Sequence, residues 1–234
     1  MEENAARLGI LMLETRFPRI PGDIGNPATW PFPVLYKIVP GASLDRVVRQ
    51  RGTGLIEPFL RAARELEAEG ADGIATTCGF LSLFQDRLAA RAGVPVATSS
   101  LLQIPLIERL LPAGKRVGII TISAASLTAD HLVGAGVDPA TPVVGTDGGR
   151  EFSQAILGDA PTLDFDAAQG DILDAGDRLL RSHAGIGAVV LECANMAPYA
   201  RALSAHLHRP VYDIVSFLTW FQAGLSPRGF ARPR

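Results

Sequence analysis

The sequence predicts an α/β protein built from two similar halves, each with a mostly parallel sheet and helices on both faces. The chain has two cysteines, Cys78 and Cys193, and each ends an apolar, β-branched run that a helix-like segment follows. They lie 115 residues apart, and the Pro-Val pairs that begin at Pro95 and Pro210 have the same separation. These matched pairs indicate a duplicated βα unit, with one thiol at the same strand end in each half.

Short apolar runs alternate with helical patterns along the first half. Residues 8–13 are typical of a buried strand, and a long loop rich in proline and glycine follows at 14–33. Apolar residues at helical spacing begin at Leu55, and Gly70 ends that helix. The other elements expected in this half are strands at 73–77 and 94–98, and helices at 80–91 and 101–111, the last one started or kinked by Pro105.

The second half repeats this alternation. Its first strand, at 116–122, contains Val-Gly-Ile at 117–119, which matches Leu-Gly-Ile at 8–10 in the first strand of the chain. Further strands are expected at 142–145, 187–191 and 210–213, and helices at 126–134, 166–182, 196–207 and 214–223.

Strands that alternate with helices form parallel sheets, and continuous apolar strands are typical of sheets buried on both faces. We therefore expect two pseudo-symmetric flavodoxin-like halves. The first lobe is expected to comprise residues 1–107 with a C-terminal helix from 214–234, and the second lobe residues 108–213. Ligands of such folds bind outside the carboxyl ends of the strands, where Cys78, Thr121 and Cys193 fall. The active site is thus expected in the cleft between the halves.

Composition argues against several classes of function. The net charge is −2 and no basic tract occurs, which argues against a nucleic-acid partner, because phosphate binding needs clustered Lys and Arg. No apolar run is long enough to cross a bilayer, and the acidic N-terminus lacks a signal-peptide pattern, so we expect a cytoplasmic protein with reduced thiols. The four histidines have no zinc-ligand spacing with either cysteine, so no metal is expected.

Two thiols at equivalent strand ends favour chemistry over packing, although a lone free cysteine is more often a buried core residue. A thiol just before a helix N-terminus meets the positive end of the helix dipole and free backbone N–H groups, which is expected to lower its pKa. A thiolate near neutral pH suits a general base or a covalent nucleophile. Cys78 and Cys193 are therefore the candidate catalytic residues.

At these residues the chain resembles the aspartate/glutamate racemase superfamily, which includes hydantoin and allantoin racemases, maleate isomerase and arylmalonate decarboxylase. The resemblance rests on Thr-Cys-Gly-Phe at 77–80, Glu-Cys-Ala-Asn at 192–195 and the strand at 117–121, and it covers nearly the whole chain. It implies a mechanism without a cofactor, in which one cysteine removes a proton as thiolate and the other protonates the opposite face as thiol. Cys-Gly-Phe stands where amino-acid racemases of the family usually have Cys-Asn-Thr, and both cysteines are present, unlike in the decarboxylase.

Substrate binding is expected at the same strand ends, where a small-molecule carboxylate can accept hydrogen bonds from the backbone N–H groups after each cysteine. The candidate substrate-binding residues are Thr77, Gly79, Phe80, Thr121, Ser123, Glu192, Ala194, Asn195 and Asn26. Four of them have structural alternatives: Thr77 as an ordinary strand residue, Ser123 as a helix cap, Asn26 in a turn before proline, and Glu192 in solvent or at a helix terminus. The functional role expected of Glu192 is to hold a substrate amino group or to tune the neighbouring thiol.

These observations predict a cofactor-independent racemase or epimerase that inverts a stereocentre next to a carboxylate or carbonyl. One alternative is a maleate-type cis–trans isomerase, in which a thiolate adds to a double bond and forms a covalent adduct. Another is a carboxylate-binding protein with a remnant site. The family resemblance and the aromatic residues Trp30 and Phe32 of the long loop suggest a homodimer.

Overall fold

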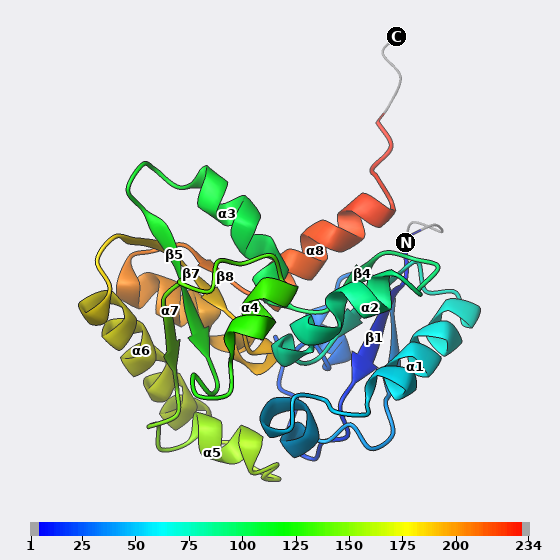
Figure 1. Ribbon diagram of the computed structural model, residues 1–234, viewed down its shortest axis with the longest axis horizontal. Coiled ribbons are helices and arrows are strands. Elements are labelled where there is room, and N and C mark those ends of the chain that lie inside the picture. The colour runs from blue at the N-terminus through cyan, green and yellow to red at the C-terminus, as the bar shows by residue number, and fades with distance from the viewer. Residues whose placement is uncertain (1–4, 231–234) are drawn as a thin grey trace.

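The computed structural model describes residues 5–230, which form two four-stranded sheets with helices around them (Figure 1). The strand order is β2-β1-β3-β4 in the first sheet and β6-β5-β7-β8 in the second. Every pairing is parallel. Because the two halves share one strand order, the α/β class and the internal repeat expected from the sequence are confirmed.

The central strands of both sheets are almost entirely buried, as their apolar sequences require for sheets covered on two faces. The first sheet consists of β1 (Leu8–Met12), β2 (Val34–Ile38), β3 (Gly73–Thr76) and β4 (Val96–Ala97). The second consists of β5 (Arg116–Thr121), β6 (Val143–Gly145), β7 (Ile186–Leu191) and β8 (Val211–Tyr212).

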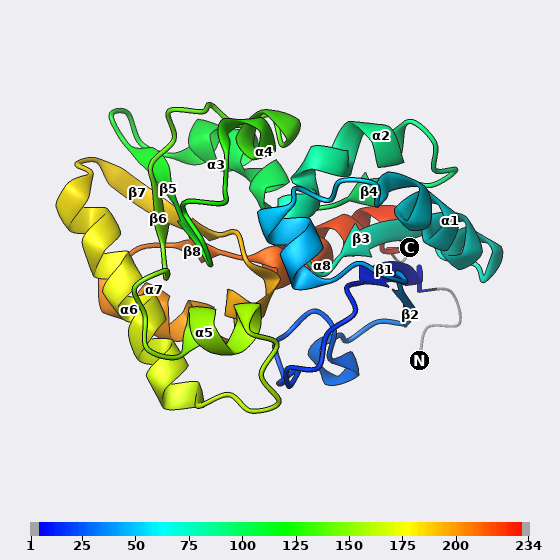
Figure 2. The same ribbon diagram turned by 60° about the horizontal axis from the view of Figure 1, so that its bottom comes forward.

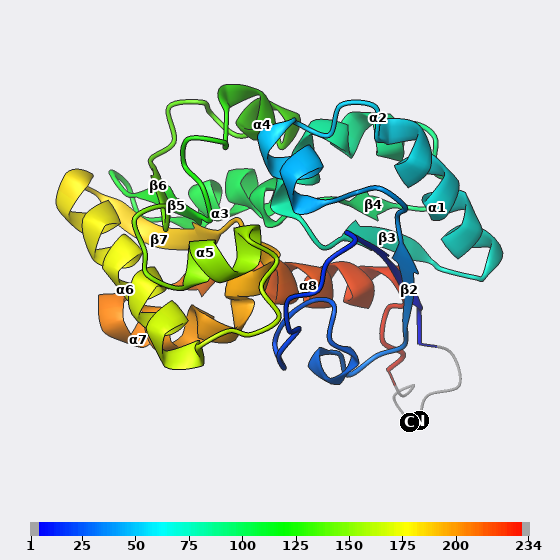
Figure 3. The same cartoon turned by 90° about the horizontal axis from the view of Figure 1, so that it is seen from below.

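Helices cover the sheets and join the halves. They are α1 (Ile56–Ala68), α2 (Gln85–Ala89), α3 (Ile104–Leu110), α4 (Ala129–Gly134), α5 (Phe152–Leu157), α6 (Phe165–Ser182), α7 (Ala200–Leu207) and α8 (Ile214–Leu225). In the first half α1 packs against β1 and β2, and in the second α6 packs against β5 and β6, with α3 on the other side of that sheet (Figure 2). The C-terminal α8 contacts β3 and the segment that follows β7, and it lies across the middle of the molecule (Figure 3).

The structure corrects the sequence analysis in three places. The edge strand β2 was not expected, because it directly follows the proline-rich loop and is only half-buried. The short helix α5 was also missed. Each cysteine is followed by a 3₁₀ segment, Gly79–Phe84 or Ala194–Tyr199, and only then by α2 or α7. None of the helices within residues 5–230 combines the length and the apolar run needed to span a bilayer.

Equivalent glycines let neighbouring side chains pack closely against the first strand of each half. A Cβ added at Gly9 would lie 2.9 Å from Ile74 Cδ1, and one added at Gly118 would lie 2.7 Å from Leu179 Cδ2. These contacts are closer than packed side chains tolerate, so the glycines of the repeated Gly-Ile pattern are needed for close packing.

The first prediction follows from this packing. Gly118→Ala should destabilise the protein by about 1–3 kcal/mol, because the added methyl group overpacks the space under α6. The matched control is Gly170→Ala, on the exposed side of α6, where a Cβ meets nothing within 4 Å. Alanine there should leave stability unchanged or raise it by up to about 1 kcal/mol. Urea unfolding measures both, and equal stability of the two variants would contradict the close packing.

Candidate active site

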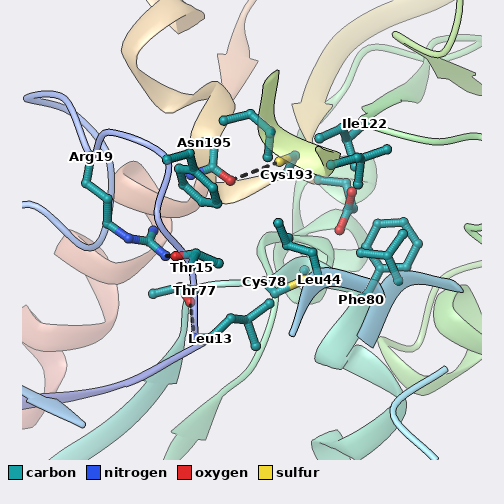
Figure 4. A pocket seen from close by; sticks show the side chains of 16 residues that line it. Leu13, Thr15, Arg19, Leu44, Thr77, Cys78, Phe80, Ile122, Cys193 and Asn195 are labelled. Atoms are coloured by element: carbon teal, nitrogen blue, oxygen red, sulfur yellow. Dashed lines mark hydrogen bonds between the residues drawn. The ribbon is translucent and has the colours of Figure 1, made fainter. Parts of the chain in front are cut away.

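A narrow pocket at the carboxyl ends of the central strands contains both cysteines. Its lining includes residues just beyond the ends of four strands: Leu13 and Ile122 directly follow β1 and β5, and Cys78 and Cys193 are the second residues after β3 and β7. Figure 4 shows the two thiols entering this pocket from different segments. The free space is about 10 Å³, enough for roughly one water molecule, so the lining side chains must separate to admit a substrate.

The two cysteines have equivalent local geometry. Each has an extended backbone and immediately precedes a 3₁₀ segment. The thiol of Cys78 accepts a hydrogen bond from the backbone N–H of Phe80, and the thiol of Cys193 accepts one from the backbone N–H of Asn195. The Cys193 Sγ also lies 3.6 Å from Asn195 Oδ1. The repeat therefore places each sulfur against the N–H group two residues further along the chain.

The pKa of both thiols is raised, which is opposite to the expectation from the helix termini. Burial is the largest cause for Cys78 and for Cys193, and the negative charge of Glu192 is the second. The N–H groups of Phe80 and Asn195 act in the opposite direction but are weaker. The expectation was wrong because a short 3₁₀ segment supplies one aligned N–H group to each sulfur, whereas burial removes nearly all of the solvent.

A polar network supports Asn195 from the long loop of the first half. The side-chain amide of Asn195 donates a hydrogen bond to Asp23 Oδ2. The other oxygen of Asp23 accepts hydrogen bonds from Arg19 Nη1 at 3.0 Å and from the backbone N–H of Gly25 at 2.7 Å. Arg19 Nη2 donates to Thr15 Oγ1 at 3.0 Å. Arg19 and Asp23 are both largely buried and belong to the same loop, so their ion pair holds the loop itself. The hydrogen bond from Asn195 to Asp23 links that loop to the site.

Glu192 places a buried carboxyl group in the pocket. It is 1% exposed, and its Oε2 accepts a hydrogen bond from Thr121 Oγ1 at 2.7 Å. Its Oε1 has no hydrogen-bond partner among residues 5–230. Burial raises the pKa of Glu192 from 4.5 to about 7, although the Thr121 hydroxyl lowers it. A Cβ at Gly79 would collide with Glu192 Oε1, so only glycine lets the two halves meet here.

The predicted substrate-binding residues divide into three groups. The residues that line the pocket are Thr77, Gly79, Phe80, Glu192 and Asn195. Thr121 and Ala194 are buried beside it, where Thr121 holds Glu192 and Ala194 packs in the core. Ser123 instead lines a second, more open pocket with Ser126, and Asn26 holds the loop by donating to the Arg19 carbonyl oxygen at 2.8 Å. Ser123 and Asn26 therefore do not line the cysteine pocket, and substrate contact at either residue stays a prediction.

The sequence analysis expected the loop after β1 at the site through Asn26, but it did not identify the loop residues that line the pocket. Thr15, Phe17 and Arg19 line the pocket, together with Leu44 and Val48 from the segment that follows β2. The Arg19 guanidinium lies 4.8 Å from the centre of the Phe17 ring. The available signal was the Arg-x₃-Asp spacing of 19 and 23 inside a segment otherwise rich in proline and glycine. Within the described part of the chain, His, Cys, Asp and Glu side chains form no group of three or more that could hold a metal ion.

The second prediction concerns the cost of burying Glu192. Its pKa is about 7 in the folded protein and near 4.5 when exposed, so the unfolded chain loses this proton first as the pH rises. The contribution of Glu192 to stability then falls between pH 4.5 and 7, by up to about 3 kcal/mol. Glu192→Gln keeps the size and the Thr121 contact but removes this loss. Urea unfolding should show the variant gaining stability relative to the wild type between pH 5 and 8.

The surface variant Glu57→Gln on α1 is the control, and its stability difference from the wild type should change little over the same range. If the stability difference between Glu192→Gln and the wild type is equally constant, the carboxyl group of Glu192 titrates as a solvated group and the prediction is wrong.

Comparison with known proteins identifies the family of the chain. The Asp/Glu/hydantoin racemase family matches the chain over residues 45–221. Among curated proteins, the chain is 28% identical over 229 residues to dimethylsulfoniopropionate lyase 7 of Emiliania huxleyi (strain CCMP1516), covering 93% of this chain and 67% of the lyase. The chain spans 57% of the length of dimethylsulfoniopropionate lyase 3 of the same organism, to which it is also 28% identical, with 89% of this chain covered.

Solved structures show the same fold. A glycine-to-cysteine mutant of arylmalonate decarboxylase, in its sulfate ion associated form, superposes with a TM-score of 0.65 at 15% identity and covers 97% of each chain. Allantoin racemase from Klebsiella pneumoniae gives a TM-score of 0.64 at 17% identity and covers 94% of this chain and 87% of the racemase. Since the family match also extends over more than half of the sequence, the chain belongs to the Asp/Glu/hydantoin racemase family.

Proposed function

We propose that this protein is a cofactor-independent racemase or epimerase that inverts a stereocentre next to a carboxylate, with Cys78 and Cys193 as acid and base. One observation supports it above all: the two thiols line one pocket, each at the equivalent strand end of its half. Inversion needs proton removal on one face of a carbon and proton delivery on the other, which two facing groups of the same kind can provide.

In the proposed reaction, the thiolate of one cysteine takes the proton from the α-carbon and becomes a thiol. The electron pair left on that carbon spreads onto the adjacent carboxylate. The thiol of the other cysteine then gives its proton to the opposite face and becomes a thiolate. Because the thiol and thiolate exchange roles in each turnover, the reverse reaction uses the same two groups in the other order.

The pocket also offers groups that can hold the substrate carboxylate. Of the described residues that line it, Arg19 alone carries a positive charge, and Asp23 and Thr15 fix the direction of its guanidinium. Thr77 adds a hydroxyl group beside Cys78. A carboxylate held by such donors is a better electron sink, because the charge that develops on it during proton removal is stabilised.

A second candidate function, β-elimination, is favoured by the lyase relatives, which match about nine tenths of this chain. The first step is the same: a thiolate removes the α-proton of a substituted propionate. The electron pair then forms a carbon–carbon double bond, and the bond from the β-carbon to its substituent breaks with its electrons. With dimethylsulfoniopropionate the products are acrylate and dimethyl sulfide. This reaction requires one base, and the second thiol is free for other roles.

The third prediction tests the two thiols separately. Cys78→Ser and Cys193→Ser should each abolish racemisation, because a serine alkoxide is too scarce near neutral pH to replace a thiolate. The remaining thiol should still exchange the α-proton of one enantiomer with D₂O, and the two variants should prefer opposite enantiomers. Proton NMR of each pure enantiomer, across amino acids, hydantoins and hydroxy acids, measures this exchange, and circular dichroism checks folding. Full racemisation by either folded variant would refute the two-thiol mechanism.

The fourth prediction separates inversion from elimination by product. In D₂O with dimethylsulfoniopropionate, a racemase should give at most deuterium uptake at the α-carbon, and proton NMR should show no vinyl signals. Elimination instead gives the vinyl protons of acrylate. The appearance of acrylate with the wild type, and its loss in Cys78→Ser or Cys193→Ser, would replace the racemase proposal by the lyase.

A further inference from the structure

The carboxyl group of Glu192 is buried in the pocket without a full set of hydrogen-bond partners. It lines the pocket and is 1% exposed, yet its Oε1 has no hydrogen-bond partner among the described residues. A buried acceptor without a partner is costly, and a buried charge without a counter-ion is more so. An unsatisfied buried polar group needs an explanation, and at the wall of a pocket a bound ligand provides one.

The surrounding protein supplies no cation to this carboxyl group. The other titratable or charged groups that line the pocket are the thiols of Cys78 and Cys193 and the guanidinium of Arg19. Arg19 is paired with Asp23 and bonded to Thr15, and Thr121 gives Glu192 only a neutral hydroxyl group. The negative charge of Glu192 therefore has no opposite charge of its own within residues 5–230.

The position of the carboxyl group is set by both halves. It extends from the end of β7 to the backbone of Gly79, where any side chain would displace it. Gly79 precedes Phe80, and Figure 4 shows Phe80 and Arg19 on opposite sides of the two cysteines. The pocket thus has a positive group toward one side, a carboxyl group toward the other, and the thiols between them.

We propose that Glu192 binds a positively charged substituent of the substrate, so that the substrate class is a small zwitterion with a carboxylate and an ammonium or other onium group. This inference rests on the proposed function, in that the cysteine pocket is taken as the active site. A bound cation completes the missing ion pair, and the substrate carboxylate lies toward Arg19. An uncharged analogue of the same shape leaves Glu192 without a partner.

The same contact connects substrate binding to the thiols. The charge of Glu192 raises the pKa of Cys78 and of Cys193. A substrate cation beside Glu192 offsets that charge and makes a thiolate easier to form. Binding of a zwitterion therefore favours the ionised base, whereas a carboxylate without a cationic group leaves the charge of Glu192 in place.

Two pairs of compounds, matched in shape, test the proposal by binding alone. The first pair is 3-(trimethylammonio)propionate and 4,4-dimethylpentanoate, and the second is 2-aminobutanoate and 2-methylbutanoate. Titration calorimetry with the Cys78→Ser/Cys193→Ser double variant excludes turnover, so the result does not depend on the reaction catalysed. In at least one pair the cationic member should bind about tenfold to a hundredfold more tightly. Its advantage should increase as the pH rises through 7, since the ionised carboxylate is the binding form.

Adding Glu192→Gln to the double variant should remove the preference and its pH dependence, while Glu57→Gln should retain both. Failure of all four compounds to bind, equal binding within both pairs, or a preference that survives Glu192→Gln would overturn the proposal. Binding that weakens above pH 7 without a cation preference would overturn it as well, because a protonated Glu192 would then be donating a hydrogen bond to the carboxylate. If the cationic compounds bind more tightly but the single cysteine variants still racemise their substrate, the zwitterion site is supported and the two-thiol mechanism is rejected.

Discussion

The contact between Gly79 and Glu192 is the constraint on which the site depends. A residue from the first half and one from the second meet here so closely that no side chain fits at 79. The hydroxyl group of Ser100 adds a second link, since it donates to the carbonyl oxygen of Leu191 at 2.6 Å. Because Cys78 precedes one side of this contact and Cys193 follows the other, the separation of the sheets and the placement of the thiols are set together.

The buried acidic groups around the pocket are compensated to different extents. Asp23 is compensated by Arg19, by Asn195 and by a backbone N–H group. Glu192 receives one hydroxyl group, and the pKa of each thiol is raised by loss of solvent. The loop side of the pocket is therefore electrostatically satisfied, whereas the strand-end side is not. In the proposed function this imbalance is useful, because a bound substrate can supply the missing opposite charge. At a solvent-exposed site water would already screen the carboxyl group, so the substrate would gain less.

The proteins that this chain resembles have different activities: they include racemases, a decarboxylase and lyases. In the reactions proposed here, inversion and elimination share the removal of a proton next to a carboxylate and differ in what happens to the electron pair. The strand ends that carry the thiols come from the repeated fold. The long loop at 14–33, which brings Arg19 into the pocket, lies outside the family match at 45–221.

The sequence by itself determined the α/β class, the duplication and the equivalence of Cys78 and Cys193, because apolar runs and a repeat at fixed separation can be read from the order of residues alone. It did not identify β2, whose half-buried residues have no strong pattern of their own. It also misjudged the thiol pKa, because solvent exclusion depends on everything packed around a sulfur. The tertiary structure alone decided that Arg19 enters the pocket and that Ser123 does not, since both depend on contacts between segments far apart in the chain.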